Sequence, residues 1–158
     1  MQILIDMFYS VITNFPLMVA LASMAIAQAV KIVYYYFKDG EVDFIHVIEA
    51  GGMPSAHSAM VSSLSVSIGL TYGWNSPAFA ICLIFSLVVM YDAMGVRRAA
   101  SKQAFILNKI VDEIYITGKD KIEKLKEIMG HSPLEVVIGL ILGILLAFIM
   151  YALIYVMI

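Results

Sequence analysis

The fold is decided first by residues 133–158, which read PLEVVIGLILGILLAFIMYALIYVMI. Only one of these residues, Glu135, is charged, and it stands near the start of the run. A helix that crosses the hydrocarbon core of a bilayer needs about 20 consecutive, mostly apolar residues. The length and composition of this run therefore predict a transmembrane helix.

Three more stretches have the same character, at about residues 15–37, 56–74 and 77–96. Over the whole chain 62% of residues are apolar and 14% are charged, and the mean hydropathy is +0.92. Soluble domains carry about 25% charged residues. We therefore predict an all-α, polytopic membrane helix bundle with four transmembrane helices, forming a single integral membrane domain over residues 1–158. Residues 1–13 either extend the first span or lie in the membrane interface.

Two further patterns concern packing. Residues 101–130 are charged but carry apolar residues at helical spacing, which predicts one or two amphipathic helices between spans three and four, broken near Thr117 and Gly118. Serines recur through the second span, and Gly139 and Gly143 lie one turn apart in the fourth. Small residues at such spacing let membrane helices approach closely, so we expect packing there; a polar lining for a lipid path is the alternative.

Charge predicts the orientation in the membrane. With four spans, the end of span one, the start of span two, the end of span three and the start of span four share one side. All 10 Lys and Arg residues fall on that side, whereas Asp6 is the only charged residue on the other. Positive residues concentrate on the cytoplasmic side of membrane proteins. We therefore expect a multi-pass protein of the cell membrane with both termini outside, and the net charge of -2 gives no reason to expect a nucleic-acid partner.

The same side collects unusual polar residues. Lys31 lies inside an apolar stretch, where an ammonium costs at least about 2.5 kcal/mol at mid-membrane unless it snorkels or pairs. The second span opens with residues 51–57, GGMPSAH, and the free N–H groups of such a helix start can bind an anion. The third span ends in Asp92, Arg97 and Arg98, and guanidinium groups suit phosphate oxygens.

The fourth span begins with a histidine and an acid. His131 and Glu135 are four residues apart, so they share a face once the helix has begun, and a carboxylate there can fix the imidazole tautomer. Each polar residue also has a plain explanation, such as a snorkelling lysine or a charge that flanks a span. Their convergence on one side favours a phosphate site. The three histidines show no metal-ligand spacing, so no metal is predicted.

These stretches resemble the divergent, short branch of the type 2 phosphatidic acid phosphatase superfamily, which is related to lipid phosphatases and vanadium haloperoxidases. That superfamily carries the motifs Lys-x6-Arg-Pro, Pro-Ser-Gly-His and Ser-Arg-x5-His-x3-Asp. The corresponding segments here are Lys31 to Asp39, Pro54 to His57, and His131 to Glu135. Lysine and aspartate replace Arg-Pro in the first motif, and alanine replaces glycine in the second. Leu125 stands where the third motif has arginine.

The resemblance implies a metal-independent phosphatase that needs no cofactor and acts on a lipid phosphate. His131 would be the nucleophile, Glu135 would orient it, and His57 would be the general acid. The resemblance also implies a set of phosphate-binding residues: Lys31, Ser55, Arg97 and Arg98. Either arginine of the third span would supply the positive charge that the third motif lacks here. Asp92 would support the site by holding that arginine in place.

The expected orientation puts this site on the cytoplasmic face. Phosphatidylglycerophosphate is then the first candidate substrate, followed by phosphatidic acid and polyprenyl phosphates. One alternative is a catalytically decayed protein that binds or translocates a lipid phosphate. Another is a structural membrane subunit that docks a partner through residues 101–130. Membrane lipids and further copies of the chain are the other partners that this interpretation allows.

Overall fold

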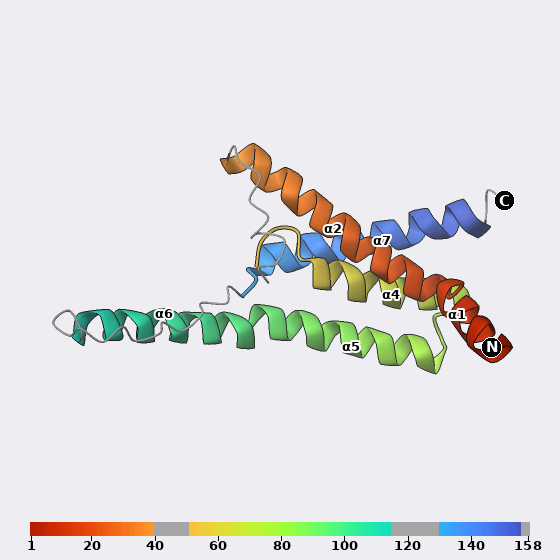
Figure 1. The fold of residues 1–158 in the computed structure, drawn as a ribbon, viewed down its shortest axis with the longest axis horizontal. Helices are drawn as coiled ribbons and strands as arrows, with labels where there is room; N and C mark the ends of the chain where they lie inside the picture. The colour runs from red at the N-terminus through yellow and green to blue at the C-terminus, as the bar shows by residue number, and fades with distance from the viewer. Residues whose placement is uncertain (40–50, 115–129, 156–158) are drawn as a thin grey trace.

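The computed structural model describes residues 1–39, 51–114 and 130–155. In this part of the chain the structure is all helical, with helices α1 (Gln2–Ile12), α2 (Phe15–Asp39), α4 (Ala56–Tyr72), α5 (Pro77–Met94), α6 (Val96–Ile114) and α7 (Pro133–Tyr155). Figure 1 shows α2 crossing α4 and α7, with α5 running beside α4. The prediction of an all-α membrane protein is confirmed.

Local signals in the sequence set the helix starts. Ser76 caps α5 by accepting a hydrogen bond from the Phe79 N–H at 3.2 Å. The start of α7 is a capping box: the Ser132 hydroxyl accepts from the Glu135 N–H at 3.4 Å, and the Glu135 carboxylate accepts from the Ser132 N–H at 3.2 Å. This reciprocal pair fixes the first turn of α7, which contains Glu135 and which His131 closely precedes.

The centre of the bundle is α4, which packs against α2, α5 and α7, while α2 also contacts α7. The α4–α7 contact is close because both helices present small residues. A Cβ atom on Gly143 would overlap the Ala59 carbonyl oxygen and the Ser62 hydroxyl. The Ser65 and Ser86 hydroxyls hydrogen-bond between α4 and α5 at 2.8 Å. These contacts confirm the packing role of the small residues.

Within the described residues, three helical segments are long and apolar enough to cross a membrane: Phe15–Lys38 with 24 residues, Pro77–Val111 with 35 and Pro133–Tyr155 with 23. The remaining expected span, the second in the chain, corresponds to α4. This helix has 17 residues and rises only about 26 Å at 1.5 Å per residue. Its length falls below that of the other three. Because neighbouring helices cover most of it, its sequence carries many small polar residues rather than a lipid-facing apolar surface.

The third apolar helix, α5, ends at Met94 with Gly95 as its C-cap, close to the expected end near residue 96. Figure 1 shows α6 continuing the line of α5 away from the other helices. The Gly95 N–H donates to the Tyr91 carbonyl of α5, and the Gly95 carbonyl accepts from the Ala99 N–H of α6, both at 2.9 Å. The expected amphipathic helix therefore starts at Val96 and runs to Ile114. The break expected near Thr117 and Gly118 lies outside the described residues.

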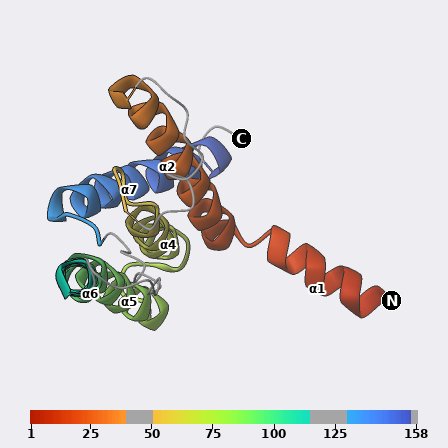
Figure 2. The same ribbon diagram turned by 60° about the vertical axis from the view of Figure 1, so that its left-hand side comes forward.

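The N-terminal helix α1 stands apart from the bundle, as Figure 2 shows, and none of its residues is buried. The chain turns at Thr13, whose hydroxyl bonds to the Tyr9 carbonyl at 2.7 Å. Asn14 then starts α2 by accepting a hydrogen bond from the Leu17 N–H at 3.2 Å. Of the two alternatives for residues 1–13, a straight extension of the first span is therefore wrong.

Candidate functional site

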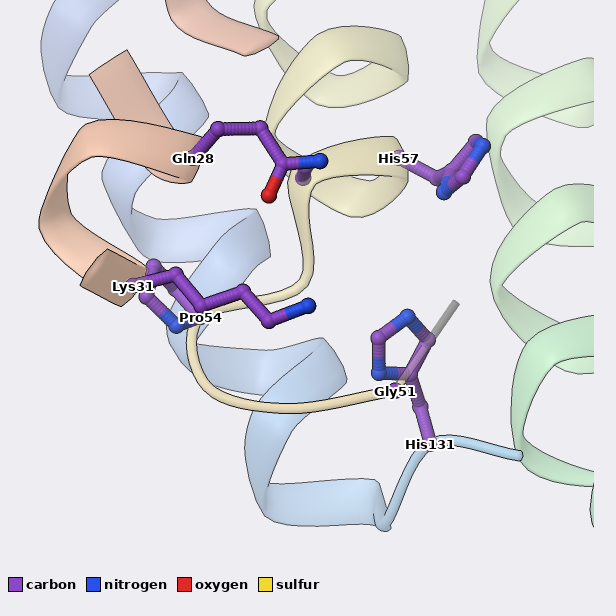
Figure 3. A pocket seen from close by; sticks show the side chains of 7 residues that line it. Gln28, Lys31, Gly51, Pro54, His57 and His131 are labelled. Atoms are coloured by element: carbon purple, nitrogen blue, oxygen red, sulfur yellow. The ribbon is translucent and has the colours of Figure 1, made fainter. Parts of the chain in front are cut away.

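A small pocket of about 20 Å³ lies where α2, the loop before α4 and the start of α7 meet. Figure 3 shows the Lys31 side chain extending toward the His131 ring, whereas the ring of His57, an exposed residue on the first turn of α4, extends to the side of the green helix. Seven residues from these three segments line the pocket: Gln28, Lys31, Gly51, Pro54, Ala56, His57 and His131. Residues that are 100 positions apart in the sequence therefore share one polar cavity.

His131 is held in one orientation. The residue is 5% exposed, and its Nδ1 lies 3.0 Å from the Glu135 Oε2. Its backbone N–H donates to the Ala93 carbonyl of α5 at 3.2 Å. A carboxylate at Nδ1 favours the tautomer with the proton on that nitrogen, which leaves the Nε2 lone pair available. A histidine arranged in this way can act as a nucleophile or as a base.

A second contact ties this histidine to the junction of α5 and α6. Gly130 packs so closely on that junction that a Cβ atom would overlap the Cα and N of Arg98 and would stand 2.8 Å from the carbonyl carbon of Arg97. Glycine is needed here because two backbone segments touch. The contact brings the end of the third apolar helix to the start of the fourth, beside His131.

Lys31 supplies a buried positive charge. It lies on α2, is 3% exposed and lines the pocket that His131 also lines. An ammonium removed from water needs compensating anionic or hydrogen-bonding groups, and a bound phosphate would be one. The plain explanation of Lys31 as a snorkelling lysine does not describe its position, because the side chain points into the bundle (Figure 3).

The arginines take different positions. The Arg97 Nε donates to the Asp92 Oδ2 at 2.8 Å, and the two side chains are 50% and 40% exposed. Arg97 also lies close enough to His57 to act on it electrostatically. Arg98 lines a separate cavity with Lys102 on α6. The structure thus places Arg97, paired with Asp92, within electrostatic range of His57, and places Arg98 in a different cavity.

Ser55 is buried beneath the pocket, but its hydroxyl is occupied by helix capping. It accepts from the Ser58 N–H at 3.4 Å and from the Ser58 hydroxyl at 3.0 Å, while its own N–H donates to the Glu135 carbonyl at 3.1 Å. Ser55 therefore joins the start of α4 to the start of α7. In this position it orients the backbone N–H groups of the α4 N-terminus.

Gln28 lines the pocket but was absent from the residues that the sequence assigned to the site. It stands one turn before Lys31 on the same face of α2. The signal that could have found it is a carboxamide inside an apolar span, three residues from the lysine. Within the described residues, no three histidine, cysteine, aspartate or glutamate side chains group to hold a metal ion.

The fold and the pocket define a helical membrane protein with a histidine–lysine site. The model of the divergent PAP2 family matches residues 12–146 of this chain. The chain belongs to that family. It is 40% identical over 150 residues to the uncharacterized membrane protein YuiD of Bacillus subtilis (strain 168), covering 88% of this chain and 95% of that protein. No solved structure matches the chain.

Proposed function

We propose that the protein is a membrane phosphatase that hydrolyses a lipid phosphate through a phosphohistidine intermediate. The observation that supports this most strongly is the buried His131, paired with the partly buried Glu135, at one wall of a pocket that Lys31 and His57 also line. A nucleophile, an orienting acid, a second histidine and a buried cation are the groups that such a reaction needs.

In the proposed reaction the Nε2 of His131 attacks phosphorus while the bond to the lipid oxygen breaks. His57 gives a proton to the leaving alkoxide. It then takes a proton from a water molecule that attacks the phosphohistidine, which releases inorganic phosphate and regenerates His131. Glu135 stabilises the positive charge on the imidazole during both steps, because its carboxylate faces Nδ1.

The remaining groups stabilise the negative charge that grows on the phosphoryl oxygens. Lys31 is the nearest cation on the pocket wall, and the backbone N–H groups of the first turn of α4 point to the same region. Arg97 is the better candidate for the guanidinium, because Asp92 holds it near His57. Ser55 acts through the helix start that it caps, and Arg98 is not needed at this pocket.

We further propose that α4 also crosses the membrane, which brings the number of spans to four. In this arrangement both termini lie outside and the pocket faces the cytoplasm. The one-sided placement of the 10 Lys and Arg residues supports this orientation. A site on the cytoplasmic face favours substrates made on the inner leaflet. Phosphatidylglycerophosphate is the first candidate, and phosphatidic acid and polyprenyl phosphates follow.

The test is phosphate release by the purified protein from a panel of these lipids, with and without EDTA. Release from at least one lipid that EDTA leaves unchanged is expected. The second candidate function is binding or translocation of a lipid phosphate without turnover, and the altered first and third motifs favour it. Tight binding of a lipid phosphate with no release from any member of the panel would select that alternative.

A further inference from the structure

A second cavity lies on the outer surface of the bundle, between α5 and α7. Its volume is about 610 Å³ and its lining is entirely apolar, including Ile84, Leu87 and Met94 of α5 with Val136, Val137 and Leu140 of α7. The floor is formed where Met90 and Val136 pack on Val61 of α4. The groove is therefore a feature of three packed helices.

The groove has the length of one leaflet of a membrane. Along α5 it runs from Ile84 to Met94, which is about 15 Å at 1.5 Å per residue. The hydrocarbon core of a bilayer is about 30 Å thick, so one leaflet contributes about half of that depth. An acyl chain that lies along this groove would thus reach from mid-membrane to the end of α5.

A cationic cavity continues from that end. It has a volume of about 270 Å³, shares Met94 with the groove, and is lined further by Gly95, Arg98, Ala99 and Lys102. Arg98 and Lys102 stand four residues apart on α6, so they present two positive charges on one face. Among the described residues no carboxylate lines this cavity, and Asp92, the nearest acid in sequence to Arg98, pairs with Arg97 instead.

We propose that this face binds an anionic phospholipid, with an acyl chain in the α5–α7 groove and a phosphate against Arg98 and Lys102. The charge argues for this occupant, because basic pockets beside membrane helices attract anionic headgroups. This site differs from the pocket of His131, because neither the groove nor the cationic cavity shares a lining residue with that pocket. The proposal also gives a role to Arg98, which lines the cationic cavity and not the pocket of His131.

Lipid binding to the purified full-length protein tests this by native mass spectrometry. Phosphatidylglycerol and phosphatidylcholine with identical acyl chains are titrated separately. Phosphatidylglycerol is expected to bind on the order of tenfold more tightly, and Arg98→Gln or Lys102→Gln to weaken it several-fold each, since one basic residue near the membrane surface contributes about that much. Lys38→Gln is the matched control, because Lys38 is an exposed lysine on α2 outside both cavities.

A second pair of variants tests the groove. Val137→Trp fills it and should reduce phosphatidylglycerol binding, whereas Leu145→Trp, at an exposed position of α7 outside the lining, should leave binding unchanged. Equal binding of the two lipids, or equal loss in the Lys38 control, would overturn the proposal. If the wild type shows no lipid selectivity and forms dimers that Val137→Trp dissociates, the proposal is wrong and a second copy of the chain occupies the groove. None of these measurements depends on phosphatase activity.

Discussion

The Glu135→Gln variant tests whether the acid supports the nucleophile. The carboxylate lies 3.0 Å from the His131 Nδ1, in a pair whose side chains are 6% and 23% exposed for His131 and Glu135 respectively. Hydrogen bonds to charged groups contribute about 1.5–3 kcal/mol, and each 1.36 kcal/mol is tenfold in rate. Glutamine keeps the shape and one acceptor oxygen but loses the charge. We therefore expect kcat to fall on the order of 10- to 100-fold, with KM changed little.

Phosphate release from the preferred lipid, measured over a range of substrate concentrations, separates the two constants. Glu135→Ala should be worse than Glu135→Gln, because it also removes the acceptor for the Ser132 N–H and so weakens the start of α7. Asp6→Asn serves as a control, since this exposed acid lies on α1, away from the bundle. Wild-type kcat in Glu135→Gln would refute the role assigned to the acid.

Three further predictions follow from the same contacts. His57→Ala should lose more activity on a lipid alkyl phosphate than on an aryl phosphate, because a good leaving group needs no general acid; equal losses on both would contradict that role. Gly143→Ala should lower the free energy of unfolding by about 1–3 kcal/mol in a detergent thermal assay, because its Cβ overlaps α4, whereas Leu145→Ala at an exposed position should cost less. In a background without the native cysteine, an impermeant thiol reagent should label Asn75→Cys but not Ser101→Cys from outside intact cells; the reverse pattern would invert the topology.

The local features of the fold were predictable from the sequence. The spacing of His131 and Glu135 predicted that they lie together, and they do hydrogen-bond, although His131 stands two residues before α7 begins. Apolar length identified the helices, although α4 is shorter than its apolar stretch because the helix ends at Tyr72, before Gly73. These features depend on residues within one or two turns of each other, which is why a single sequence carries them.

The contacts between distant segments were not predictable. Two adjacent arginines have equal claims in sequence, and only the folded structure shows that Arg97 acts electrostatically on His57 while Arg98 lines a separate cavity with Lys102. Gln28 lines the pocket only because α2 packs beside the start of α4. In each case tertiary contacts override or complete a weak local signal.

The central claim is that His131 carries the phosphoryl group, and trapping that group tests it most directly. The purified protein is mixed with a lipid whose phosphate is radiolabelled and is quenched within one turnover. Wild type should carry label that is stable to base and lost in acid, as a phosphohistidine is, and His57→Ala should accumulate more of it because hydrolysis stalls. His131→Ala should carry no label and release no phosphate. Wild-type turnover in His131→Ala, or label that persists on that variant, would contradict the mechanism.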